Sequence, residues 1–148
     1  MTEQPKRNPG IRAIIIFSLL VFLLSLTQTA LTYNDFNGTG SYSSISLFAI
    51  GGVSILGGAL PEWLTWMANP IYIVAVFLFA FKKKAAIVLS TIATLIAFSF
   101  LFWNDILVSE NGRTVPIISV KFGYICWLAS MIILMTGTRI YLKKEKTE

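Results

Sequence analysis

The chain has 148 residues, of which 55% are hydrophobic, 14% aromatic and only 13% charged, and its formal net charge is +5. Water-soluble domains of this length carry a smaller apolar share, so the composition excludes an ordinary soluble domain and indicates a membrane protein. So short a chain has no room for a large soluble domain beside several spans, and we expect one compact unit of helices and connections.

The first apolar run, residues 13–31, reads AIIIFSLLVFLLSLTQTAL and is long enough to cross a bilayer as a helix of about 20 residues. It follows a polar leader, residues 1–12, that contains Lys6, Arg7 and Arg12. This pattern also fits a secretory signal peptide, but the residues that follow lack a convincing A-x-A cleavage site. An uncleaved signal anchor is therefore favoured, and either alternative places Thr32 onward on the outer side.

The next segment, residues 33–44, reads YNDFNGTGSYSS, and its turn-forming residues predict a loop. Its Asn37-Gly38-Thr39 triplet matches the N-glycosylation acceptor pattern. That triplet is common by chance and matters only in a host that glycosylates exported chains.

Residues 45–81 are too long for one span, because a single helix of this length would extend for about 55 Å. Gly57-Gly58 is a helix stop, and Pro61-Glu62 is a helix start with proline in the first turn and an acid beside it. These signals predict a span over residues 62–81. Residues 45–60 are then either a fifth short span or a half-buried helix on the outer side.

The distribution of basic residues decides between these alternatives. With four spans, ten of the twelve Lys and Arg residues fall on the cytoplasmic side, and only Arg113 and Lys121 fall outside. With five spans, the Lys82-Lys83-Lys84 cluster and the basic tail, residues 143–148, cannot both stay inside. The positive-inside rule therefore favours four spans with both termini cytoplasmic and a half-helix at residues 45–60.

The last two spans are predicted over residues 85–103 and 117–142. Between them, residues 104–116 read NDILVSENGRTVP, in which Glu110-Asn111-Gly112-Arg113 is a turn signal between β-favouring segments. A small outer hairpin is expected there.

The second span begins with an unusual stretch, EWLTWMANP. In this topology Glu62, Trp63 and Trp66 lie at its outer mouth, which is typical of an interfacial anchor. Deeper in the span, Pro70 frees the carbonyl four residues earlier, and the Asn69 amide can bond to that carbonyl, so a kink is expected.

A sharper alternative is a transport site at this break, because discontinuous helices expose polar backbone groups. Lys121 and Tyr124 at the start of the last span would complete it through a contact between Glu62 and Lys121. Lys121 is close enough to the membrane surface to reach water by itself, so no such contact is required.

Small and hydroxyl residues recur at Gly51, Gly52, Ser54, Gly57 and Gly58 and again at Ser90, Thr94 and Ala97. Small residues let membrane helices approach closely. They indicate either tight packing within this bundle or a contact face for a partner or a second copy.

The chain has no histidine, and Cys126 is its only cysteine. Zinc sites, disulfide frameworks, c-type haem attachment and histidine-dependent nucleophiles are therefore not expected, and we predict neither a cofactor nor a metal. An enzyme would have to use Glu62, Asp105, Glu110 or Lys121. The basic residues flank spans, which explains the net charge through lipid headgroups rather than nucleic acid.

Two motifs carry a resemblance. The W-x-A-N-P segment at Trp66 to Pro70, a basic cluster after the following apolar run, and G-Y-x-x-W-L-A-S at Gly123 to Ser130 resemble small uncharacterised bacterial inner-membrane proteins of about four spans. The likeness covers about the last two thirds of the chain. It implies a bacterial cytoplasmic membrane and a packing cluster of the motif residues, but no activity.

The sequence thus predicts an all-α, multi-pass inner-membrane protein with a four-helix bundle. A non-enzymatic accessory or envelope factor that acts by helix–helix association is the favoured function, and an oligomeric channel or small-solute transporter is the alternative. The candidate cluster comprises Glu62, Trp63, Trp66, Asn69, Pro70, Lys121, Tyr124 and Trp127.

Overall fold

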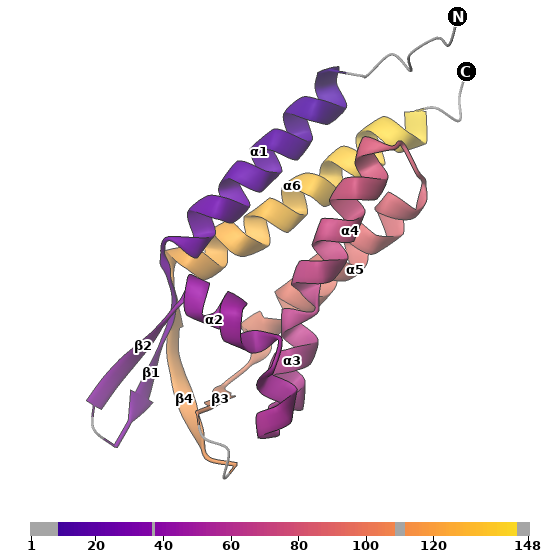
Figure 1. The fold of residues 1–148 in the computed structure, drawn as a ribbon. Coiled ribbons are helices and arrows are strands. Elements are labelled where there is room, and N and C mark those ends of the chain that lie inside the picture. Colours follow the sequence, from indigo (N-terminus) through magenta and orange to yellow (C-terminus); the bar gives the residue numbers. More distant parts are fainter. Residues whose placement is uncertain (1–8, 37, 109–111, 145–148) are drawn as a thin grey trace, which may run out of the picture.

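The computed structural model describes residues 9–36, 38–108 and 112–144. In these residues, four helical segments are long and apolar enough to cross a membrane: α1 (Pro9–Leu26), α3 with α4 (Leu60–Trp66 and Ala68–Ala80), α5 with the 3₁₀ turn η2 (Ala85–Ser99 and Phe100–Phe102) and α6 (Phe122–Lys144). They alternate in direction, so α1 begins and α6 ends at the same end of the bundle (Figure 1). The four predicted spans are confirmed as helices of sufficient length and hydrophobicity.

The described residues are mostly helical, as predicted, but the fold is not all-α because it also contains a sheet. The other end of the bundle carries a four-stranded antiparallel sheet in the order β2-β1-β4-β3. Its strands are β1 (Thr29–Asp35), β2 (Gly38–Ser43), β3 (Asp105–Leu107) and β4 (Thr114–Val120). The predicted hairpin at residues 104–116 is confirmed as β3 and β4, with Glu110 and Asn111 outside the described residues.

The predicted loop at residues 33–44 instead forms the end of β1 and all of β2, with Asn37 outside the described residues. Two side chains just before it, in β1, show how this hairpin is held to the rest of the sheet. Leu31 lies opposite Val120 of β4 and is almost fully buried, and the Thr32 hydroxyl lies 2.9 Å from the Ser119 hydroxyl. Pairing with a distant strand therefore overrides the local turn propensity.

The sheet also moves two span boundaries. The first span was predicted to end at residue 31 but ends at Leu26, because the following residues enter β1. The last span was predicted to start at residue 117 but starts at Phe122, because β4 continues to Val120. The third span starts at Ala85 as predicted and ends in a 3₁₀ turn, η2 (Phe100–Phe102).

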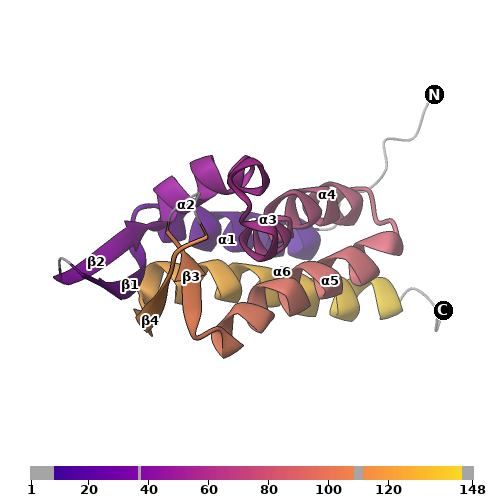
Figure 2. The same cartoon turned by 90° about the horizontal axis from the view of Figure 1, so that it is seen from below.

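The predicted half-helix at residues 45–60 forms two shorter pieces, α2 (Ser44–Gly51) and the 3₁₀ helix η1 (Ser54–Gly57). The Ser43 side chain accepts a hydrogen bond from the Ser46 N–H and so begins α2. Gly58 ends η1 with a φ of 83°, which confirms the predicted glycine stop. In Figure 1 α2 runs across the direction of α1 and α6, and Figure 2 shows it at the sheet end of the bundle, near α3.

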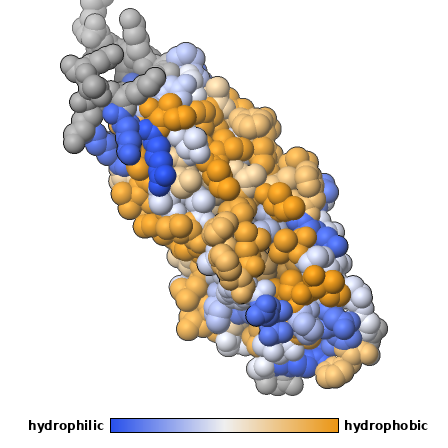
Figure 3. Space-filling model, turned by 180° about the vertical axis from the view of Figure 1, so that it is seen from behind, coloured by the Kyte–Doolittle hydropathy of each residue, from blue (hydrophilic) through white to orange (hydrophobic). Residues whose placement is uncertain are grey.

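Within the bundle, α6 packs against α1 and α5, and α4 packs against α5. Alanines and hydroxyl side chains fill these contacts: Ser18, Ala75, Ala86, Ser90, Ala93, Ala97 and Thr138 are all buried. Close approach of small residues is what holds helices together where lipid is as apolar as the core. Figure 3 shows a broad hydrophobic surface along the bundle, with hydrophilic residues gathered at both ends.

Candidate functional site where the bundle meets the sheet

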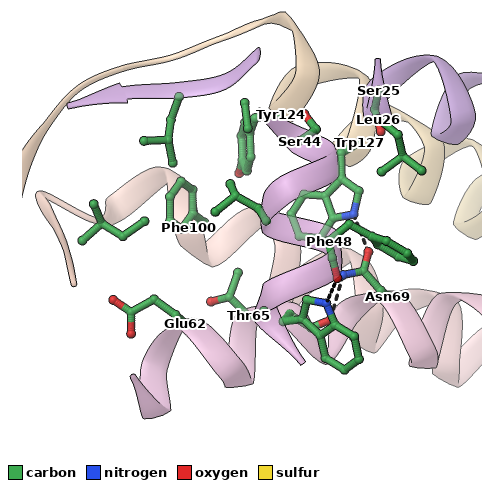
Figure 4. A pocket seen from close by; sticks show the side chains of 16 residues that line it. Ser25, Leu26, Ser44, Phe48, Glu62, Thr65, Asn69, Phe100, Tyr124 and Trp127 are labelled. Atoms are coloured by element: carbon green, nitrogen blue, oxygen red, sulfur yellow. Dashed lines mark hydrogen bonds between the residues drawn. The ribbon is translucent and has the colours of Figure 1, made fainter. Parts of the chain in front are cut away.

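A cavity of about 130 Å³ lies where the core of the bundle meets the smaller core beneath the sheet. It is found at the level of the helix ends: Leu26 is the last residue of α1, Asn69 lies in the first turn of α4, and Phe100 directly follows α5. Segments of α2, α3 and α6 and of the sheet complete its wall (Figure 4). Residues from six helical elements and from two hairpins therefore meet around this cavity.

Five of the eight candidate residues line this cavity: Glu62, Trp66, Asn69, Tyr124 and Trp127. Pro70 directly follows Asn69 in α4. Trp63 and Lys121 do not line it, and Lys121 instead borders a shallow polar depression with Gln28 and Thr29. The structure therefore brings five of the eight candidate residues together around one cavity.

The break in the second span lies at Met67, between α3 and α4. The Asn69 Nδ2 donates a hydrogen bond of 2.9 Å to the Trp66 carbonyl, which is the carbonyl that Pro70 leaves without a backbone donor. This bond is the one predicted from the sequence. The Asn69 Oδ1 accepts a second bond of 2.8 Å from the Trp127 indole, so the amide joins the break to α6.

Trp66 fastens α2 to α3. Its indole N–H donates a hydrogen bond of 2.8 Å to the Phe48 carbonyl, and its ring lies against Gly51 and Gly52 at the end of α2. A Cβ on Gly51 would lie 2.3 Å from the Trp66 ring, and one on Gly52 would lie 3.1 Å from it. These two glycines therefore serve packing within this chain, which is one of the two roles that the sequence left open.

Tyr124 closes the cavity on the side of α5. Its hydroxyl donates a hydrogen bond of 2.8 Å to the Ala97 carbonyl, and its ring lies 5.4 Å from the Phe100 ring and 5.8 Å from the Trp127 ring. Aromatic rings at these separations pack favourably. The contacts hold the first turns of α6 against the end of α5.

Glu62 ties α3 to the sheet, because its Oε1 accepts a hydrogen bond of 2.9 Å from the Leu107 backbone N–H in β3. No ion pair joins it to Lys121 among the residues that the structure describes. Lys121 precedes α6, is exposed, and donates its backbone N–H to the Ala30 carbonyl. It thus lies outside the helix, and the cost expected for a lysine within the span does not arise.

Sequence reasoning did not name the cavity residues that come from β1 and from the short elements α2 and η2. Ala30 and Leu31 of β1, Ser44 and Phe48 of α2, and Phe100 of η2 all contribute to the cavity wall. The Ser44 hydroxyl is buried without a hydrogen-bond partner among the described residues, and it packs where a side chain on Gly123 would lie. Only the apolar side chains in these segments could have indicated burial.

The wall consists mainly of apolar surface, and its polar groups are largely bonded to one another. The hydrogen bonds given above use the polar side-chain groups of Trp66, Asn69, Tyr124 and Trp127. The Ser25 hydroxyl donates a hydrogen bond to the Phe22 carbonyl. In the described part of the chain, no three His, Cys, Asp or Glu side chains gather where a metal could bind, and Cys126 is buried as a free thiol. The site can therefore offer apolar contact rather than reactive groups.

Comparisons of the chain with protein-family models, with curated proteins and with solved structures find no match.

Proposed function

We propose that the protein is a multi-pass protein of a bacterial inner membrane, with both termini cytoplasmic, that acts without catalysis by associating with another membrane protein. The observation that supports this most directly is the β1–β2 hairpin, which extends away from the bundle (Figure 1). Within the described residues β2 pairs only with β1, so its other edge is open. An open strand edge is a template for pairing with another chain.

The hairpin also presents apolar surface. The Phe36 side chain at the end of β1 is 89% exposed. Arg113 lies over the ring at 5.5 Å and pairs with Asp35 at 3.1 Å, so the base of this tip is joined to the other hairpin. The Phe36 side chain is therefore held in place by Arg113, and it can serve as a contact for a partner.

The transport alternative has less support. It relied on polar groups left open at the helix break, but both polar atoms of the Asn69 amide are engaged, one by the Trp66 carbonyl and one by Trp127. The Glu62 Oε1 is engaged by the sheet. A solute would have to displace these internal bonds.

Purification after gentle detergent extraction at native expression tests association. We expect a complex larger than the single chain, and we expect the double variant Thr39→Lys/Ser41→Lys on β2 to lose its partner, because charges on an edge strand oppose pairing. Thr39 and Ser41 are exposed, and Asn104→Lys/Thr114→Lys is the matched control with two lysines at other exposed positions of the sheet end. The control should keep the partner.

A single chain in the wild-type extract, or an edge variant that keeps its partner, would refute this mode of association. A complex that contains only copies of this chain would show self-association and would revive the channel alternative.

The topology has its own support and its own test. Lys82, Lys83 and Lys84 lie between α4 and α5, at the end of the bundle where α1 begins and α6 ends (Figure 1). In a Cys126→Ala background, we expect a membrane-impermeant maleimide to label Thr39→Cys from the outer side and Lys83→Cys only after the membrane is opened. The reverse pattern would invert the topology.

A further inference from the structure

The cavity at the junction of bundle and sheet has the size of a small-molecule site. It is partly open rather than enclosed, and its volume of about 130 Å³ is close to that of an enclosed engineered cavity of roughly 150 Å³ in another protein that stays dry and binds benzene. Well-packed interiors leave few voids larger than one water molecule. A space that can hold several carbon atoms therefore suggests that a ligand binds here.

The chemistry of the cavity wall indicates which class of ligand can bind. Leu26 and Phe48 face it from one side and Phe100 from the other (Figure 4), and Leu47 and Ile106 also line it. The indole and amide groups that reach the wall already bond to protein acceptors. Water in a cavity needs two to four polar partners, and a polar solute needs as many, so an apolar group fits this wall best.

The position of the cavity indicates that its apolar ligand comes from the membrane. It lies at the level where α1 ends and α4 and α6 begin, and α1 with its 18 residues is about 27 Å long, close to the hydrocarbon thickness of a bilayer. The segments α2 and α3, which line it, expose apolar side chains on their outer surface, with Ile50 at 63% and Leu64 at 52%. These segments thus face the region where lipid chains are the abundant apolar molecules.

We propose that this cavity binds a segment of the hydrocarbon chain of a membrane phospholipid, held between Trp66 on α3 and Trp127 on α6. The chain fills the gap between the core of the bundle and the core of the sheet and so links the two. This goes beyond the proposed association, because binding requires only the protein and lipid.

Fluorescence quenching by brominated lipid tests the proposal. The chain has four tryptophans, and the reporter Trp63→Phe/Trp103→Phe keeps only Trp66 and Trp127, both in the cavity wall. In vesicles of phosphatidylcholine with brominated chains, the reporter should be quenched relative to vesicles of the unbrominated lipid. Added to the reporter, Ala30→Leu and Thr65→Leu fill the cavity from β1 and α3, and each should lose most of this quenching.

Ala80→Leu in the same background is the matched control, because Ala80 is exposed and lies outside the cavity wall. It should be quenched as strongly as the reporter. If the filled variants are quenched as strongly as Ala80→Leu, the bromines reach the tryptophans from bulk lipid and the proposal is wrong. An unquenched reporter would also overturn it. Since the two filling changes lie on different elements, either folded variant decides the test.

Discussion

The indole of Trp127 donates a hydrogen bond of 2.8 Å to the side-chain oxygen of Asn69, across the interface between α6 and α4. The same amide donates its Nδ2 to the Trp66 carbonyl that Pro70 leaves without a partner. One side chain therefore repairs the helix break and also fixes the position of the broken helix. This explains why a proline is compatible with a long span in this chain.

Replacement of Asn69 by leucine should lower the free energy of unfolding by about 1 to 2 kcal/mol, because it leaves both the Trp66 carbonyl and the Trp127 N–H without these partners. Denaturation of the purified protein in bilayer discs would measure the loss. Thr136→Val is the control, since Thr136 is exposed and its hydroxyl bonds only to a carbonyl of its own helix. Equal stability of the two variants would show that the amide has no such role.

A second polar contact lies deeper in the bundle, between α1, α4 and α6. The Ser18 hydroxyl donates to the Ser130 carbonyl at 2.8 Å and lies 2.6 Å from the Tyr72 hydroxyl. Since the serine has only one proton to donate, the tyrosine must be the donor between the two hydroxyls. Tyr72 is fully buried, so its hydroxyl depends on Ser18 as acceptor.

We therefore expect Ser18→Ala to cost about 1 to 2 kcal/mol, because it leaves a buried hydroxyl without an acceptor, and Tyr72→Phe to cost less. The double variant should be more stable than Ser18→Ala alone, since it removes the stranded hydroxyl. A double-mutant cycle measured by denaturation gives the coupling. Costs that simply add would contradict the shared bond.

The parts of the fold that were predictable from the sequence rest on local rules. The spans follow from apolar length, and the bond from Asn69 to the Trp66 carbonyl follows from what proline removes four residues earlier. The start near Pro61 and the stop at Gly58 also follow from the preferences of single residues. Each of these signals lies within one turn of the structure that it determines.

Apart from the β3–β4 hairpin, the sheet and the cavity could not be predicted in the same way. Leu31 is buried because Val120, in a strand almost ninety positions later, pairs with it, and nothing near Leu31 indicates that partner. The wall of the cavity combines residues such as Phe48 and Phe100 from short elements whose docking depends on the sheet. The candidate cluster was partly found because tryptophan, asparagine and proline stand out locally, whereas its apolar neighbours do not.

Gly123, at the start of α6, should tolerate no side chain. A Cβ there would lie 2.2 Å from the Ser44 hydroxyl and 2.6 Å from the Thr29 carbonyl oxygen. Gly123→Ala should therefore cost about 1 to 3 kcal/mol, the usual cost of an overpacked site. Addition of Ser44→Gly should restore only part of the stability, because the Thr29 contact is to backbone. Full restoration in a denaturation experiment would mean that α6 and β1 are not in close contact here.

Tyr42 makes the sheet sensitive to high pH. It lies in β2, outside the spans, with its ring 4.9 Å from the Tyr33 ring. Partial burial, which is the larger cause, and the neighbouring Tyr33, which is a smaller one, raise the pKa of Tyr42 above its ordinary value. A phenol with a raised pKa in the folded state favours folding while it is protonated. This contribution is present below the unfolded pKa of about 10 and is lost as the pH rises through the folded pKa.

We therefore expect the stability of the sheet end to fall above about pH 10, and Tyr42→Phe to remove the part of that fall that depends on Tyr42. Tyr33→Phe should reduce the fall without abolishing it, because burial, the larger cause, remains. Amide hydrogen exchange in β1 and β2, corrected for the intrinsic rate at each pH, measures the opening of the hairpin. An unchanged fall in Tyr42→Phe would assign the pH sensitivity to other groups, since a phenylalanine at this position keeps the ring contact but has no proton to lose.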